Sequence, residues 1–227
     1  IDFSRPEAVS GLLTYAQVKG MAVVIATTGH SAEELNAIRS YAKKIPVFMS
    51  ANMSLGVNLQ MDLVRKAAEF LGRAYDIEIV EKHHNTKIDS PSGTALALAQ
   101  AASSAFPKPL EFCYGRHSKT ERRGTEEIGI HAVRGGTLAG EHDVLFLGAD
   151  EVLEINHRAL SKHIFAAGAV RAAAYIAGKP PGLYNMKDII TEQSAITNLY
   201  ADDGQAVITI NRVPHSPRFI ANLFNAL

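Results

Sequence analysis

The chain has one cysteine, no tryptophan and no excess of either charge. A single cysteine, Cys113, excludes a disulfide within the chain and is typical of a protein in a reducing cytoplasm. The 23 acidic and 23 basic residues give a formal net charge of zero, which argues against nucleic acid or an anionic membrane as the main partner. No apolar run approaches the roughly 20 residues that span a bilayer. The first residues also lack the basic and apolar regions of a signal peptide. We therefore expect a cytoplasmic protein.

What the chain does contain is an alternation of strand and helix patterns. The run 21–27 is apolar and β-branched, as in a buried parallel strand, and 47–49 has the same character. Helical patterns are found at 5–19, 32–44 and 57–71. This order predicts a doubly wound α/β domain with a parallel sheet.

Strand patterns become more frequent after residue 76. They predict strands at 76–80, 128–133, 143–147 and 152–155. Gly135 and Gly136 lie between two of these strands and have no helix after them, so they predict a turn or a bend rather than a phosphate loop. We expect an α+β region here with an open mixed sheet, followed by a last helix from 165 to about 178.

Two imidazoles and an ammonium follow the strand that begins at Asp76. The strand runs into His83 and His84, and because neighbouring strand residues point to opposite faces, one histidine is expected to face a pocket more directly. Histidine titrates near neutrality, so His83 is a candidate proton donor. Lys87 lies in the polar turn that follows. The alternative is that the histidines only end a strand and that Lys87 is a solvated surface charge.

A helix start follows this turn. Asp89 or Ser90 is expected to cap the helix, with Pro91 in its first position. The free backbone amides at such a start attract anions. A substrate carboxylate is therefore expected on Gly93 and Thr94, with Lys87 as a cationic clamp.

The whole segment Glu81 to Ala95 resembles the signature of the 4-hydroxy-tetrahydrodipicolinate reductase (dihydrodipicolinate reductase) family and departs from it only at Ser90, where the family usually has alanine. The resemblance covers roughly residues 1–190. It implies an enzyme of lysine and diaminopimelate biosynthesis that uses NADH or NADPH to reduce 4-hydroxy-tetrahydrodipicolinate, a small dicarboxylate, to tetrahydrodipicolinate. It also implies site roles: His83 as proton donor or acceptor, Lys87 as the second proton-transferring and carboxylate-binding group, and His84, Gly93 and Thr94 as substrate-binding residues.

Two strand-to-helix loops, residues 26–29 and 50–54, resemble the nicotinamide-contacting loops of the same family. Both lie where ligands bind in such sheets, beyond the carboxyl ends of strands. Ala26 stands where the family usually has glycine, a change expected to have a small effect. The alternative is that both are ordinary turns. The implied cofactor contacts are Ala26, Thr27, Thr28, Ser50, Ala51, Asn52, Met53 and Arg5.

The resemblance also implies a domain organisation. Residues 1–54 and 165–190 would form the nucleotide-binding domain, and 55–164 the substrate-binding and tetramerisation domain. The family's first strand and glycine-rich phosphate loop should precede Ile1, so we expect that the chain is an N-terminal truncation. Open sheets with exposed edges often pair with copies of themselves, and the family implies a homotetramer.

Residues 191–227 lie beyond the family resemblance. They predict a strand followed by an amphipathic helix and resemble the start of an ACT domain of the aspartate kinase type, which binds amino-acid effectors. The alternative is a family-specific extension or an oligomer arm.

Two other functions compete with the reductase. One is a metal-dependent hydrolase that uses His83 and His84 with Asp89, although no tight zinc-type ligand spacing is visible and we expect no metal. The other is a catalytically impaired fragment that serves assembly or amino-acid effector binding.

Overall fold

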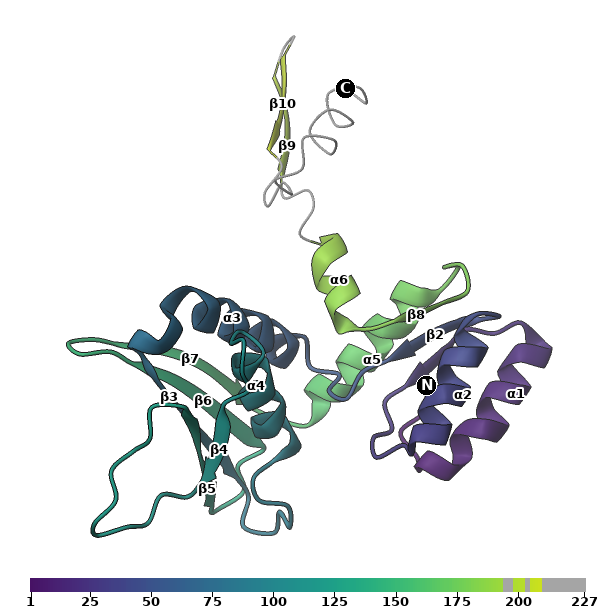
Figure 1. The fold of residues 1–227 in the computed structure, drawn as a ribbon. Coiled ribbons are helices and arrows are strands. Elements are labelled where there is room, and N and C mark those ends of the chain that lie inside the picture. The colour runs from purple at the N-terminus through teal and green to yellow at the C-terminus, as the bar shows by residue number, and fades with distance from the viewer. Residues whose placement is uncertain (194–197, 203–204, 210–227) are drawn as a thin grey trace.

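The computed structural model describes residues 1–193, 198–202 and 205–209 and contains two separate sheets in its first 193 residues (Figure 1). The smaller sheet has the order β1-β2-β8, and both pairings are parallel. Its strands are β1 (Val23–Ile25), β2 (Pro46–Met49) and β8 (Gly182–Tyr184). Asp2 extends it, because its backbone amide donates to Val24 and its carbonyl accepts from Ala26.

Helices cover both faces of this sheet. Successive strand residues point to opposite faces, so Val23 and Ile25 pack with one apolar cluster and Val24 with another. The first cluster includes α1 (Val9–Lys19), which a 3-10 turn η1 (Pro6–Ala8) precedes, and α2 (Ala32–Ala42). The second includes α5 (His163–Ile176) and α6 (Met186–Gln193). Burial on both faces explains the continuous apolar run and confirms the predicted doubly wound α/β fold.

The larger sheet has the order β4-β5-β3-β6-β7. Strand β5 pairs in parallel with both β4 and β3, whereas β6 pairs antiparallel with both β3 and β7. This confirms the predicted mixed sheet. Its strands are β3 (Asp76–His83), β4 (Glu111–Tyr114), β5 (Glu127–Arg134), β6 (Gly140–Leu147) and β7 (Val152–Ala159). Gly135 and Gly136 form part of the turn between β5 and β6, as predicted.

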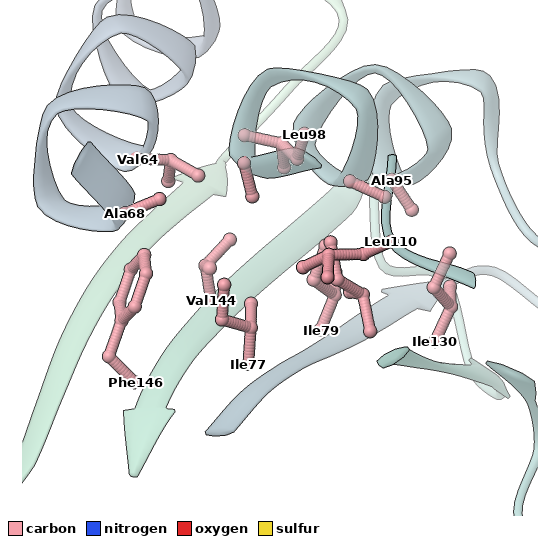
Figure 2. Packing of buried hydrophobic residues seen from close by; sticks show 13 residues of the cluster. Val64, Ala68, Ile77, Ile79, Ala95, Leu98, Leu110, Ile130, Val144 and Phe146 are labelled. Atoms are coloured by element: carbon pink, nitrogen blue, oxygen red, sulfur yellow. The ribbon is translucent and has the colours of Figure 1, made fainter. Parts of the chain in front are cut away.

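Two helices, α3 (Leu55–Leu71) and α4 (Gly93–Ser103), pack on one face of this sheet. Figure 2 shows Val64 and Ala68 of α3 and Leu98 of α4 over side chains of β3 and β6. Ile77 and Ile79 of β3 lie in this core. The same face continues beyond the core with Glu81 and His83, because side chains two apart share a face. The apolar core therefore gives way to ionisable groups where β3 ends.

The start of α4 differs from the prediction. Neither Asp89 nor Ser90 caps the helix. The cap is Ser92, whose hydroxyl accepts a hydrogen bond from the amide of Ala95, so Pro91 precedes the cap. The prediction placed the helix start two or three residues too early, because Asp89, Ser90 and Ser92 are all residues that can cap a helix.

The described part of the tail contains two paired strands. Strands β9 (Asn198–Asp202) and β10 (Gln205–Thr209) pair antiparallel, where a single strand was expected. The expected amphipathic helix and most of the segment that resembles an ACT domain fall outside the described residues.

Gly168 of α5 lies against the backbone of the loop after β2. A Cβ at this position would be 1.8 Å from the carbonyl oxygen of Met53, so alanine requires the helix or the loop to move. We expect Gly168→Ala to lower the free energy of unfolding by about 1–3 kcal/mol, the usual cost of overpacking. Urea denaturation measures this change.

Gly11→Ala is the matched control. Gly11 also lies in a helix, but its added Cβ would meet nothing within 4 Å, so alanine should stabilise α1 slightly. Equal stabilities of the two variants would contradict the close contact between Gly168 and Met53.

Candidate active site

A cavity of about 760 Å³ lies between elements of the two sheets. On one side, Thr28 and the loop 50–52 follow β1 and β2 of the parallel sheet. On the other side are His83 and His84, where β3 ends, together with Lys87 and the start of α4. The carboxyl edge of the parallel sheet therefore faces the signature segment.

The cavity brings together nine residues that the sequence singled out: Thr28, Ser50, Ala51, Asn52, His83, His84, Lys87, Gly93 and Thr94. Four others do not line it. Thr27 is buried and donates its hydroxyl proton to Asp2 at 2.7 Å, and Met53 is buried in an apolar cluster. Arg5 is exposed at the start of η1, and Ala26 packs against the apolar cluster that includes α5.

His83 is held from behind by a buried carboxylate. Its Nδ1 lies 2.6 Å from Oε2 of Glu81, whose side chain is completely buried. Burial is the main influence on His83 and lowers its pKa. Glu81 opposes this effect, while the charges of Lys87 and Arg134 add to it, and the pKa remains below the ordinary value. The other ring nitrogen, Nε2, lies beside Gly140, where a Cβ would be 2.8 Å away.

Glu81 is ionised in this setting. Burial by itself raises the pKa of a carboxyl, but hydrogen bonds from Arg134, His83 and the Ser92 amide outweigh it and hold the Glu81 pKa below its ordinary value. The negative charge is therefore present next to His83 at neutral pH.

His142 of β6 is a second buried histidine at the site. Its ring meets that of His83 edge to face, with centroids 5.1 Å apart, and its Nε2 lies 2.9 Å from Oγ of Ser92. Burial lowers the pKa of His142 to about 4, so this ring is uncharged at neutral pH. The sequence predicted no role for His142, which reaches the site because β6 pairs with β3 and places it opposite Glu81.

Lys87 lies in the loop between β3 and α4. Its Nζ forms a salt bridge of 2.7 Å with Oδ1 of Asp89, and this contact holds the pKa of Asp89 below its ordinary value. Its side chain is 20% exposed, so it is partly enclosed by the cavity wall. In the same loop, Nδ1 of His84 lies 2.7 Å from the hydroxyl of Thr86.

The N-terminus of α4 opens onto the cavity. Gly93 and Thr94 occupy its first turn, where a helix has no carbonyl partners for its amides. The side-chain amide of Asn52 donates to Oγ1 of Thr94 at 3.1 Å, so the loop after β2 contacts the N-terminal end of the helix directly. Free amides at a helix start are suited to a carboxylate.

Four further residues of the wall are Lys162, Phe165, Asn185 and Lys187. They come from the starts of α5 and α6, far along the chain from the signature segment. The local sequence does mark one of these starts, since Asn185 accepts from the Lys187 amide and Asp188 accepts from the Asn185 amide, as in a capping box.

In the described part of the chain, no group of three or more histidine, cysteine, aspartate or glutamate side chains is placed to hold a metal ion. Asp89, which the metal-dependent alternative requires, is paired with Lys87. Among the same residues, no helix is both long and apolar enough to cross a membrane.

Comparison with protein families identifies both parts of the chain. Residues 56–190 match the family described as dihydrodipicolinate reductase, C-terminus, and residues 1–53 match its N-terminus. The chain belongs to the dihydrodipicolinate reductase family. The junction between the two matches falls at Ser54, which caps α3 by accepting a hydrogen bond from the Val57 amide.

Relatives within the dihydrodipicolinate reductase family are similar over most of the chain. The 4-hydroxy-tetrahydrodipicolinate reductase of Caldanaerobacter subterraneus subsp. tengcongensis is 53% identical over 190 residues, which are 84% of this chain and 75% of the relative. That of Clostridium tetani is 50% identical over 188 residues, 82% of this chain and 72% of the relative. A solved structure, the dipicolinate-bound dihydrodipicolinate reductase of Paenisporosarcina sp. TG-14, has a TM-score of 0.68 and 25% identity, and the match covers 83% of this chain and 72% of that one.

Proposed function

We propose that this member of the dihydrodipicolinate reductase family reduces 4-hydroxy-tetrahydrodipicolinate to tetrahydrodipicolinate with NADH or NADPH, in lysine and diaminopimelate biosynthesis. The observation that carries the proposal is the single cavity that His83, Lys87 and the α4 N-terminus share with the loops after β1 and β2. The curated relatives that share about half of its residues are named for this activity.

The substrate is a dianion, and the cavity offers two places for carboxylates. One carboxylate accepts hydrogen bonds from the amides of Gly93 and Thr94 at the positive end of α4. Lys87 and His84 supply donors for the second, and Lys87 adds a positive charge at the cavity wall.

The residues of the opposite wall fit a nicotinamide. Thr28 and the loop 50–52 present hydroxyl, amide and backbone groups beyond the carboxyl ends of two neighbouring parallel strands, where cofactors bind in doubly wound sheets. A volume of about 760 Å³ has room for a nicotinamide ring beside a small dicarboxylate. The cofactor supplies the hydride, and the protein contributes binding, orientation and electrostatics. Ala26, Thr27 and Met53 are proposed to act from behind this wall by holding the two loops in place, and the exposed Arg5 is proposed to contact the cofactor.

His83 and Lys87 are proposed to handle the proton. Nδ1 of His83 is occupied by Glu81, which leaves Nε2 to exchange a proton with the substrate. The adjacent His142 is uncharged, so a proton on His83 meets no second imidazolium. Lys87, in the loop that follows β3, is the second proton-transferring group and neutralises substrate charge.

We also propose the domain division and assembly that the family implies. Residues 1–54 and 165–190 bind the nucleotide, 55–164 bind the substrate and form a homotetramer, and 191–227 are an extension. Strands β4 and β7 are the edges of the larger sheet in the described residues, and the open edges of such a sheet often pair with copies of themselves, which supports the assembly. The edge strand β7 also exposes Val152 and Leu153.

Titration with pyridine-2,6-dicarboxylate tests the substrate site. We expect calorimetry to show saturable binding to the wild-type protein, tighter with NADH present, and a loss of binding in Lys87→Ala. Lys66→Ala is the control, because Lys66 is an exposed lysine on α3 that pairs with Asp62. If a cooperatively folded wild-type protein bound no dicarboxylate with or without NADH, the proposed function would be wrong.

A further inference from the structure

The buried carboxylate of Glu81 takes part in four hydrogen bonds. Its Oε1 accepts hydrogen bonds from the Ser92 amide at 2.9 Å and from Arg134 Nη2 at 2.7 Å. Its Oε2 is 2.8 Å from Arg134 Nη1, which donates to it, and 2.6 Å from His83 Nδ1. Both carboxylate oxygens are thus fully engaged, and the side chain has no exposed surface.

An ionised carboxylate fixes the proton of the ring nitrogen that it contacts. It can only accept hydrogen bonds, so Nδ1 of His83 must carry a hydrogen. In the neutral ring the lone pair then lies on Nε2, and in the charged ring both nitrogens carry hydrogens. Glu81 therefore selects the tautomer in which Nε2 exchanges the proton.

Arg134 connects this carboxylate to the loop that carries Lys87. Besides its paired bonds to Glu81, its Nη2 donates to the backbone oxygen of Asp89 at 2.7 Å. The side chain of Asp89 in turn holds the ammonium of Lys87 at 2.7 Å. The Arg134 guanidinium at the end of β5 thus binds both the carboxylate that holds His83 and the backbone of Asp89, the residue whose side chain holds Lys87.

We propose that Glu81 and Arg134 form a positioning unit that sets the tautomer of His83 and places Lys87 beside it. This inference rests on the proposed function of His83 and Lys87 as the proton-handling groups. Neither Glu81 nor Arg134 touches the cavity, so both act through the residues that do.

Packing alone does not account for a carboxylate at this position. Ile77 and Ile79 lie on the same face of the same strand and are buried among apolar side chains. A buried ion pair contributes little net stability compared with apolar residues of similar volume, because both charges lose their hydration. The orientation that Glu81 and Arg134 impose on His83 and on the Lys87 loop explains why this pair is buried despite the loss of hydration.

Glu81→Gln is the decisive variant, with Glu78→Gln as a matched control. Glu78 lies on the same strand, points to the opposite face and also binds an arginine and a histidine, Arg123 and His131. Nitrogen NMR of the imidazoles, with the His83 signals assigned through a His83→Gln sample, reports the tautomer directly and needs neither substrate nor cofactor.

We expect wild-type His83 to be protonated on Nδ1 in its neutral form, and Glu81→Gln to show a mixture of tautomers. The kcat should fall about 10- to 100-fold, as for partners that orient metal-ligating histidines, with a small change in KM. Because Glu81 raises the pKa of His83, the limb of the pH–rate profile that belongs to His83 should move to lower pH. The other charged or titratable groups near the ring, Lys87, Arg134, His142 and His157, are unchanged in the variant.

Arg134→Lys covers the case in which Glu81→Gln does not fold. It keeps a positive charge but cannot make paired bonds to Glu81 and also reach Asp89. We expect a lower kcat and, because the Lys87 loop loses a tether, a higher KM for the dicarboxylate.

Two results would overturn the inference. One is an unchanged His83 tautomer and pH profile in folded Glu81→Gln, and the other is an equal shift in Glu78→Gln. If the wild-type protein showed no reductase activity but kept the Nδ1–H tautomer of His83, and Glu81→Gln still lost it, the proposed function would fail while the positioning role would stand.

Discussion

Lys87→Ala is expected to lower kcat by about 100- to 1,000-fold, within the range for loss of a general acid–base group. The variant loses a proton donor and also the positive charge that neutralises a substrate carboxylate, so KM for the dicarboxylate should rise as well. The side chain is 20% exposed and belongs to a loop rather than to a core cluster, so folding should be intact. Oxidation of NADH at 340 nm, with circular dichroism and thermal unfolding on the same samples, measures both properties.

Lys66→Ala provides the comparison for this result. It also removes a lysine that forms one salt bridge, but from the surface of α3. Its kcat and KM should match the wild type. A Lys87→Ala enzyme with wild-type rates would remove Lys87 from the proposed chemistry.

His83→Gln is expected to lower kcat by about 100- to 10,000-fold. Glutamine retains a polar group that can meet Glu81, but it cannot exchange a proton at neutral pH. Burial keeps the pKa of His83 below its ordinary value, so the wild-type limb assigned to His83 should lie at a lower pH than the limb of an unperturbed histidine. The limb should be absent from the pH–rate profile of the variant.

An exposed histidine serves as the control for this variant. His117 lies in the exposed loop between β4 and β5, and His117→Gln should retain both the rate and the pH limb. A His83→Gln enzyme that keeps the same limb would show that another group titrates there, and His84 would be the next residue to replace.

The parts of the site that could be predicted are those that lie together in the sequence. His83, His84 and Lys87 lie in one continuous segment with the start of α4, so the local pattern alone was enough to group them, and all three line the cavity. Arg134 and His142 could not be assigned in this way. They reach Glu81 only through the pairing of β3 with β5 and β6, and strand register does not follow from residue pattern alone.

The fold followed from residue pattern where burial is regular. The continuous apolar run at β1 indicated a strand covered on both faces, and the charged alternation at β3 indicated a strand covered on one face. Loop residues were harder to place, because consecutive residues of a turn point in different directions. In the first loop, Thr28 faces the cavity, whereas Thr27 is buried and binds Asp2. In the second loop, Asn52 faces the cavity, whereas Met53 packs in the apolar core.

The hydrogen bond from Asn52 to Thr94 determines the direction of a hydroxyl group. The Ser54 amide donates to Oδ1 of Asn52 at 2.8 Å, which leaves the NH2 of the same side chain facing Oγ1 of Thr94. Since Oγ1 already accepts from Asn52, the hydroxyl hydrogen of Thr94 is directed elsewhere, and the N-terminal end of α4 gains a donor. The loop that follows a strand of the parallel sheet thus occupies one acceptor position of Thr94 and turns its hydroxyl hydrogen toward other acceptors, such as a carboxylate.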